Sequence, residues 1–208
     1  MSVVVCLSGR GSNLRALMEK GVVPQAVISD NPEAPGLRFA AHAEVPIHIL
    51  AAAKTRLDFS TSFLEMLDGL SPRLVVLAGF MRVLDKRVTH AYAGRIINIH
   101  PSLLPAFPGL DTHLRAIASG VRLHGATVHY VNHILDGGPI ISQAAVPVFP
   151  EDSPDVLATR VLLQEHKLLP WTVQAILEER IWLEDERVRY DPALFAPEDE
   201  ESLFSPAF

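Results

Sequence analysis

Short apolar runs alternate with helix-like segments along the first hundred residues, and this rhythm limits the possible fold more than any other feature. Residues 2–7 form a run rich in β-branched side chains, as expected for a strand buried on both faces. The same reasoning predicts strands at residues 25–29, 47–50, 74–78 and 95–100, and helices at residues 13–20, 36–44, 57–70 and 85–92. The alternation therefore predicts an α/β fold with a mostly parallel central sheet and helices on both faces.

The rhythm changes after residue 100. Three prolines, Pro101, Pro105 and Pro108, lie close together and predict a stiff loop, because proline lacks the backbone donor that a regular helix needs. A helix is expected at residues 112–119, and extended segments at 126–131 and 140–148.

The C-terminal quarter begins with a strong helix signal. Ser153 and Pro154 have the residue types preferred at the N-cap and first position of a helix. We expect Pro170 to kink or split this helix before residues 171–179. Residues 181–190 alternate weakly and predict a small hairpin.

The composition favours one folded domain with small-molecule partners. The chain has 208 residues, of which 49% are hydrophobic and 20% charged, so it can bury a sizeable core. Its net charge of −6 would repel nucleic-acid phosphates. No apolar run approaches the roughly 20 residues that cross a bilayer, so we expect a cytoplasmic protein without a membrane partner. The single cysteine, Cys6, lies in an apolar run and is expected to be a core thiol.

A glycine-containing loop, Ser8 to Asn13, joins the first expected strand to the first helix. Backbone N–H groups can converge on an anion at such a helix N-terminus, and phosphate is the natural guest. The loop lacks the third glycine of a dinucleotide fingerprint, where Leu14 stands, and it lacks a Walker lysine. Asp30 nevertheless lies where a ribose-binding carboxylate would lie, so a nicotinamide site and a plain tight turn remain open alternatives.

Asn98 and His100 stand two residues apart at the end of the fifth expected strand. Residues with this spacing face the same side of a strand, and the carboxyl ends of strands are where open α/β sheets bind ligands. An amide and an imidazole aimed at one point can stabilise an oxyanion and move a proton. The alternative is a polar strand end without catalytic function.

A further cluster of polar residues lies between His124 and Asp136. Thr127 and His129 share a strand face, and Asp136 opens the turn that ends at Pro139. A carboxylate within about 4–6 Å of His100 would favour the protonated imidazole. The spacing of His129 and His133, in a segment expected to be extended, does not indicate a metal site, and we expect no metal.

Six segments, taken together and in order, resemble the glycinamide ribonucleotide formyltransferase family, which are folate-dependent enzymes of purine synthesis: residues 8–14, 75–82, 97–105, 124–129, 135–139 and 164–166. The resemblance implies a Rossmann-like formyltransferase fold, and we expect a single domain at residues 1–190. The composition of residues 191–208 predicts an acidic, proline-containing tail. The resemblance also implies the substrates 10-formyltetrahydrofolate and phosphoribosylglycinamide. We expect a monomer or homodimer.

The resemblance assigns roles to particular residues. It implies that Asn98, His100 and Asp136 are catalytic. The residues implied to bind the substrate are Gly11, Ser12, Asn13 and Glu165, and those implied to bind the folate are Arg56, Met81, Arg82, Val83, Leu84 and Asn98.

Two positions depart from the family pattern. Leu162 stands where the family commonly has a polar or basic residue that helps to bind phosphate, so phosphate recognition would rest more on the loop amides and Arg10. Asp111 replaces the usual histidine of the Pro-Gly-Leu-His-Thr-His stretch, and the sequence does not explain this change.

Three other functions compete with this interpretation. A formyltetrahydrofolate hydrolase would use the same residues with water as acceptor, but usually has an additional N-terminal domain. A methionyl-tRNA formyltransferase would have a basic C-terminal domain, whereas this C-terminus is acidic. A non-catalytic sugar-phosphate-binding module would need the loop but not Asn98, His100 and Asp136.

Overall fold

The computed structural model describes residues 2–50 and 55–194, with the backbone alone at Arg56. The chain divides into two compact units. Unit 1 contains Met1–Asn98 and Val131–His133, and unit 2 contains Ile99–Tyr130 and Ile134–Phe208. The boundary falls inside strand β5 (Ile96–His100), so each unit contributes some of the residues that the sequence singled out.

Unit 1 is built on a parallel sheet with the strand order β3-β2-β1-β4-β5. Its strands before β5 are β1 (Val3–Leu7), β2 (Ala26–Ser29), β3 (Ile47–Ile49) and β4 (Leu74–Leu77). All five strands lie within one or two residues of their expected places. The side chains of β1, β2 and β4 are buried throughout, which explains why the sequence shows apolar runs there instead of an alternating pattern.

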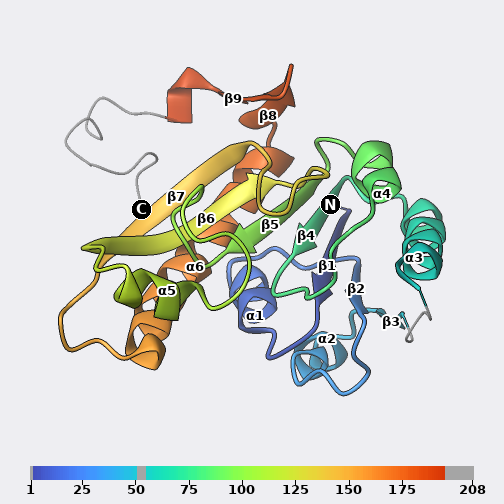
Figure 1. Ribbon diagram of the computed structural model, residues 1–208. Helices are drawn as coiled ribbons and strands as arrows, with labels where there is room; N and C mark the ends of the chain where they lie inside the picture. Colours follow the sequence, from blue (N-terminus) through green and yellow to red (C-terminus); the bar gives the residue numbers. More distant parts are fainter. Residues whose placement is uncertain (1, 51–54, 195–208) are drawn as a thin grey trace. The chain divides into compact units, whose positions relative to one another are not determined.

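Helices cover both faces of this sheet (Figure 1). They are α1 (Ser12–Glu19), α2 (Leu37–His42), α3 (Arg56–Leu70) and α4 (Lys86–Ala91). Right-handed crossovers place α1 and α2 on one face and α3 and α4 on the other, because the chain reverses its direction across the sheet after β3. One core cluster joins Val4 and Cys6 of β1 to Phe63 of α3 and Val88 of α4. Burial there, with the nearby negative charge of Asp30, raises the pKa of the Cys6 thiol, so this cysteine is a core residue as expected.

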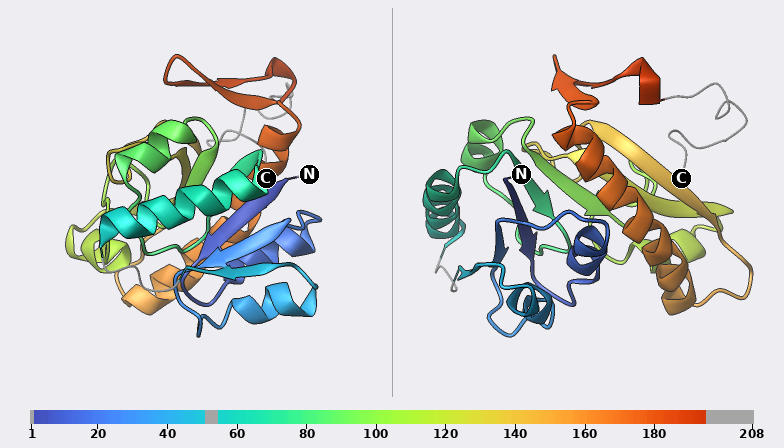
Figure 2. Two further views of the ribbon diagram at one scale, coloured as in Figure 1. Left: turned by 90° about the vertical axis from the view of Figure 1, so that its right-hand side faces the viewer. Right: turned by 180° about the vertical axis from the view of Figure 1, so that it is seen from behind.

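Unit 2 centres on an antiparallel pair, β6 (Leu123–Tyr130) and β7 (Ile140–Pro147), against which α6 (Pro154–Leu177) packs. The register of the pair shifts between Val128 and His129. The remaining elements are α5 (Thr112–Ala118), the hairpin of β8 (Ile181–Glu184) and β9 (Arg187–Tyr190), and a 3-10 helix at Pro192–Leu194 (Figure 2). The expected hairpin and the expected turn between the extended segments are both confirmed.

One expectation about α6, that Pro170 could split it, is wrong. The helix begins as expected, with Ser153 as N-cap and Pro154 in its first turn, but it continues without a break through Pro170. Leu168, Leu169 and Pro170 are all buried, and α6 packs on β6 and β7. This tertiary burial stabilises the helix enough to offset the hydrogen bond that proline cannot make.

None of the helices in the described part of the chain is both long enough and apolar enough to span a bilayer. The expected tail lies mostly at residues 195–208, outside the described residues.

Candidate active site

The loop between β1 and α1 is shaped by a close approach of two glycines in unit 1. Gly11 has a left-handed backbone, with φ of +70°, and a Cβ placed on it would lie 2.5 Å from the Cα of Gly36. Gly36 also donates its N–H to the carbonyl of Gly9 at 3.0 Å. Only glycine can combine the left-handed backbone of Gly11 with this close approach to Gly36.

Helix α1 starts directly after this turn. Its hydrogen-bond ladder begins with Arg15 N–H bonded to the Gly11 carbonyl at 3.0 Å. The first turn of a helix presents backbone N–H groups along the positive end of the helix dipole, so the stretch from Gly11 to Asn13 has the geometry of an anion site. Arg10 is exposed beside it and adds a positive charge.

Asp30 follows β2, and both of its carboxylate oxygens are engaged within the protein. Oδ1 accepts a hydrogen bond from the Ser8 hydroxyl at 2.6 Å, and Oδ2 accepts one from Arg82 Nε at 2.8 Å. Asp30 thus joins the start of the glycine loop to the segment after β4.

The segment after β4 supplies the residues expected to bind folate. Met81 is 67% exposed, Val83 is 48% exposed and Arg82 is partly exposed, so all three can contact a ligand with their side chains. Leu84 differs, because its side chain belongs to the core cluster of unit 1 and only its backbone is suited to a contact. Arg56 is the first residue of α3, and its side chain lies outside the described part of the structure.

Asn98 and His100 occupy alternate positions of β5 and so point to the same side of the strand. Asn98 is in register with Leu77 of β4 and is half-buried. His100 is buried, with 6% of its surface exposed. Both therefore stand at the carboxyl end of a parallel strand, as expected.

The structure brings Asp136 to His100 within unit 2. Asp136 Oδ2 lies 3.5 Å from His100 Nδ1, and both side chains are largely buried. The same oxygen accepts the N–H of Gly109 at 2.8 Å, and His100 Nε2 lies 3.0 Å from the Phe107 carbonyl. Both imidazole nitrogens of His100 thus lie close to oxygen atoms of the protein.

His129 is a close neighbour of this pair that the sequence did not assign a role. Its Nε2 lies 3.8 Å from Asp136 Oδ1, and its Nδ1 lies 2.9 Å from the Tyr130 carbonyl. Burial lowers the pKa of His129 below its usual range, with the Tyr130 hydrogen bond and Asp136 opposing this shift. The only indication in the sequence that His129 could lie near this pair was its position on the same strand face as Thr127.

Thr127 and Gln143 hold the proline loop on the β6–β7 pair. The Thr127 hydroxyl donates to the Ser102 carbonyl at 2.6 Å and accepts the Leu104 N–H at 3.0 Å. Gln143 Nε2 donates to the Leu104 carbonyl and to Thr127 Oγ1, each at 2.9 Å. Gln143 was missed, since a polar residue in an otherwise apolar strand does not reveal its partners.

A second histidine pair lies near the same loop. His124 Nε2 is 3.2 Å from His113 Nδ1, and the His124 ring lies edge-on to Phe107. Burial, reinforced by His113, lowers the pKa of His124 to about 4. Burial also lowers the pKa of His113. Both rings are therefore neutral near pH 7.

Glu165, expected to bind substrate, lies in α6 with Leu162, and Asp111 lies directly before α5. Glu165 is 8% exposed, and Leu162 lies one turn before it and is half-buried. Arg160 of the same helix is engaged with Asp152 through two hydrogen bonds of 2.6 and 2.8 Å. Asp111 precedes α5 in a left-handed conformation with φ of 55°, which aspartate tolerates better than most residues.

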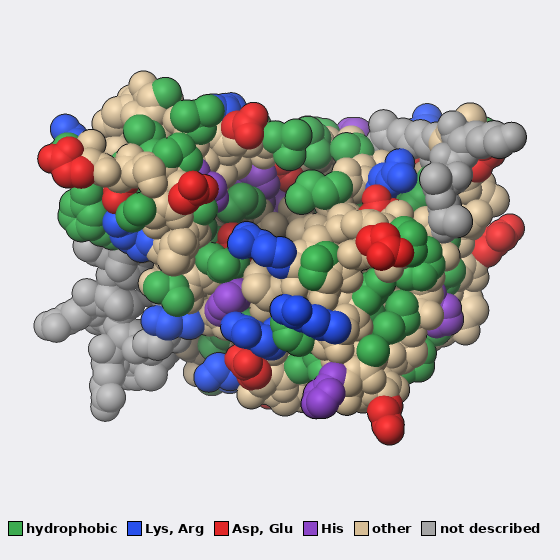
Figure 3. All heavy atoms as spheres, turned by 90° about the horizontal axis from the view of Figure 1, so that it is seen from below, with side chains coloured by type: hydrophobic (Ala, Val, Ile, Leu, Met, Phe, Trp, Pro, Cys, Tyr) green, Lys and Arg blue, Asp and Glu red, His purple; other side chains and the backbone are tan. Residues whose placement is uncertain are grey.

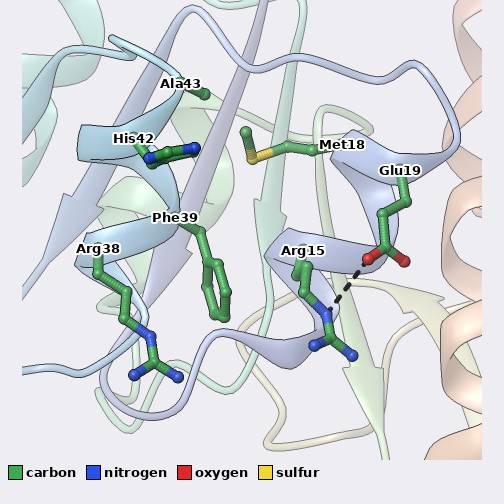
Figure 4. Close-up of a pocket in the computed structure, with 7 residues that line it drawn as sticks. All are labelled: Arg15, Met18, Glu19, Arg38, Phe39, His42 and Ala43. Atoms are coloured by element: carbon green, nitrogen blue, oxygen red, sulfur yellow. Dashed lines mark ion pairs between the residues drawn. The ribbon is translucent and has the colours of Figure 1, made fainter.

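A separate surface pocket of about 570 Å³ lies between α1 and α2 (Figure 4). Phe39 and Met18 supply its apolar surface, and Arg15 is paired with Glu19 at 3.5 Å. No residue expected to be catalytic or substrate-binding lines it.

Basic side chains also gather near the middle of the face shown in Figure 3, although the chain as a whole is acidic.

Among the described residues, no group of three or more His, Cys, Asp and Glu side chains is arranged to hold a metal ion. Asp136 instead lies between two histidines, with one oxygen 3.5 Å from His100 and the other 3.8 Å from His129.

The parallel sheet, the glycine-shaped loop and the His100–Asp136 pair together define a class of protein: the chain belongs to the formyl transferase family, whose model matches residues 1–173. Within this class it is similar to named phosphoribosylglycinamide formyltransferases. The Escherichia coli K12 protein of that name is 42% identical over 204 residues, which are 90% of this chain and 96% of that protein.

Solved structures agree with this placement. The phosphoribosylglycinamide formyltransferase from Coxiella burnetii superposes with a TM-score of 0.87 at 42% identity, over 92% of this chain and 93% of that one. A formyltetrahydrofolate deformylase from Pseudomonas syringae is also similar, with a TM-score of 0.83 at 28% identity, over 91% of this chain and 65% of that one. The Rossmann-like formyltransferase fold inferred from the sequence motifs is thus confirmed.

Proposed function

We propose that this protein transfers the formyl group of 10-formyltetrahydrofolate to the amine of phosphoribosylglycinamide, a step of purine biosynthesis. The observation that carries the proposal is the buried His100–Asp136 pair, in a chain that is 42% identical to an enzyme of that name. Both substrates are small molecules. We further propose a cytoplasmic enzyme, monomeric or homodimeric, that needs no metal and binds neither nucleic acid nor membrane.

The proposed reaction is a direct transfer. The amine attacks the formyl carbon, the carbonyl π bond becomes an oxyanion, and a tetrahedral intermediate forms. Asn98 donates a hydrogen bond to the oxyanion, and the His100 imidazolium stabilises the same oxygen. Collapse breaks the bond from carbon to N10, which takes a proton from His100. The proton that the amine loses passes through a water to Asp136. After the products, the formylated amine and tetrahydrofolate, have left, Asp136 releases this proton to solvent and His100 regains one at Nε2.

The geometry around His100 supports a role for His100 as proton donor and for Asp136 as its partner. Nδ1 faces Asp136, so Nε2 is the nitrogen that can reach a substrate. Nε2 is bonded to the Phe107 carbonyl, so the substrate oxygen has to replace that carbonyl during catalysis.

The binding residues are proposed from the same resemblance. Gly11, Ser12 and Asn13 would hold the substrate phosphate through the helix N-terminus, with Arg10 nearby. Glu165 would contact the glycinamide part of the acceptor. Folate would bind against Arg56, Asn98 and the segment from Met81 to Leu84.

The test is an assay of folate deformylation with the purified protein. We expect the absorbance change of 10-formyltetrahydrofolate consumption only when phosphoribosylglycinamide is present. Equal deformylation without any amine would contradict the proposal. It would favour the hydrolase alternative, which the similarity to the Pseudomonas syringae deformylase supports. No deformylation with phosphoribosylglycinamide or with water as acceptor would favour a binding module.

A further inference from the structure

Asp30 stands at the carboxyl end of β2 and connects two loops of unit 1 with one carboxylate. Its Oδ1 accepts from the Ser8 hydroxyl at 2.6 Å, at the start of the glycine loop. Its Oδ2 pairs with Arg82 Nε at 2.8 Å, in the segment after β4. The Asp30 side chain is only 11% exposed, so solvent weakens these charge-assisted bonds less than it would on an open surface.

Ser8 strengthens the connection from the other side. Its Oγ accepts the Met81 N–H at 2.9 Å while donating to Asp30, and its own N–H donates to the Gly79 carbonyl at 3.0 Å. The Asn31 side-chain amide donates to the Ser8 carbonyl at 3.2 Å. The N–H and the hydroxyl of Ser8 therefore tie the glycine loop to the segment after β4, and its carbonyl is bonded to Asn31.

Arg82 is held in place from two directions. Asp30 binds its Nε, and the guanidinium carbon lies 5.4 Å from the centre of the Phe59 ring. A guanidinium stacked on an aromatic face and paired with a carboxylate keeps one orientation. The free edge of Arg82 is then presented from a fixed position.

We propose that Asp30 is a positioning residue that couples the glycine loop, where the acceptor phosphate would bind, to the segment after β4, where the folate donor would bind. Displacing Arg82 alters the glycine loop through Asp30, and displacing Ser8 alters the donor segment in the same way. Affinity for each substrate thus depends on the state of the other loop. This inference rests on the proposed function, because that function assigns one substrate to each loop.

The experiment is a cycle of Asp30→Ala, Arg82→Ala and the double variant, with KM measured for both substrates. Asp30→Ala should raise both KM values by about fivefold or more, a coupling of ordinary size. Arg82→Ala should raise the donor KM directly and also the acceptor KM. In the Asp30→Ala background, the effect of Arg82→Ala on the acceptor KM should disappear. Additive effects of the two changes on the acceptor KM would overturn the proposal.

Two further variants separate positioning from general destabilisation. Asp30→Asn keeps one side-chain oxygen and can serve one of the two donors, so it should recover part of the lost affinity. Glu19→Ala removes the exposed Arg15–Glu19 pair of the same unit and should leave both KM values unchanged. If Asp30→Ala lowered only the melting temperature and left both KM values unchanged, Asp30 would be merely structural.

A measurement without substrates keeps this inference distinct from the proposed function. Amide hydrogen exchange at residues 9–14 should accelerate in Arg82→Ala, and should show no further acceleration when Arg82→Ala is added to Asp30→Ala. Absence of formyl transfer by the unaltered protein would refute the function, whereas unaltered exchange in Arg82→Ala would refute the coupling.

Discussion

The glycine loop of unit 1 and the cluster of His100, His129 and Asp136 in unit 2 are held in shape by different kinds of contact. The loop depends on backbone shape, because Gly11 and Gly36 approach so closely that no side chain fits. The cluster depends on side chains from segments far apart in sequence, since His100 meets Asp136 and both are held by the loop containing Phe107 and Gly109. The shape of the loop thus comes from the packing of backbone against backbone, whereas the histidine site depends on side chains that the fold brings together.

The largest expected effect breaks the side-chain cluster. His100→Ala should lower kcat by about 10²–10³, because the oxyanion loses a donor and N10 loses its proton source. Asn98→Ala should produce a loss of similar size. Steady-state kinetics with both purified substrates measure these losses. The matched control is His133→Ala, an exposed histidine that should keep kcat near that of the unaltered protein. Near-normal turnover in His100→Ala would remove it from the mechanism.

The next effect breaks the backbone geometry. Gly11→Ala puts a Cβ 2.5 Å from the Cα of Gly36, so the two backbones must separate. We expect a loss of about 1–3 kcal/mol in the free energy of unfolding from this overpacking, together with a raised KM for the phosphate-bearing substrate. Urea denaturation and kinetics give the two values.

Gly21→Ala is the control for that variant. Gly21 also has a positive φ, of +81°, but a Cβ there meets no described atom within 4 Å. It should therefore cost stability through backbone strain alone and leave the KM unchanged. Equal KM values in Gly11→Ala and Gly21→Ala would show that the Gly11–Gly36 contact does not shape the anion site.

A smaller effect should appear as a pH dependence of stability. The pKa of His124 is lowered to about 4 in the folded protein, against about 6.5 in an unfolded chain. Between these values the unfolded state binds more protons, so stability is present above pH 6.5 and is lost as the pH falls toward 4. We expect roughly 1–3 kcal/mol to be lost over this window, the upper value being the full shift at about 1.4 kcal/mol per pKa unit. Denaturation at several pH values should show a weaker slope for His124→Gln, and an unchanged slope would contradict the assignment.

The smallest expected effect concerns Arg10. This exposed cation lies beside the proposed phosphate site, so Arg10→Ala should raise the KM for the acceptor by roughly two- to fivefold, with less effect at high salt. Arg122→Ala, at another exposed arginine, is the control. A tenfold or larger change would mean that Arg10 replaces the phosphate contact missing at Leu162, and that the backbone amides contribute less than proposed.

Much of unit 1 could be predicted, because its strands are buried on both faces and are separated by regular helices. The continuity of α6 through Pro170 could not, since it depends on the burial of that helix face against β6 and β7. The environment of His100 was predicted only in part. Resemblance to a family indicated Asp136, but the contacts of His129, Thr127 and Gln143 emerged only in the structure.

By itself, the sequence determined the parallel α/β layers, the glycine turn before α1 and the shared direction of Asn98 and His100. Each of these follows from local rules: the burial pattern of strands, the freedom of glycine and the alternation of side chains along a strand. Only the tertiary structure decided that Asp136 lies 3.5 Å from His100 and that Asp30 engages Ser8 and Arg82 with separate oxygens. Such contacts join residues 22 or more positions apart, and no local spacing encodes a distance that the packing of whole elements sets.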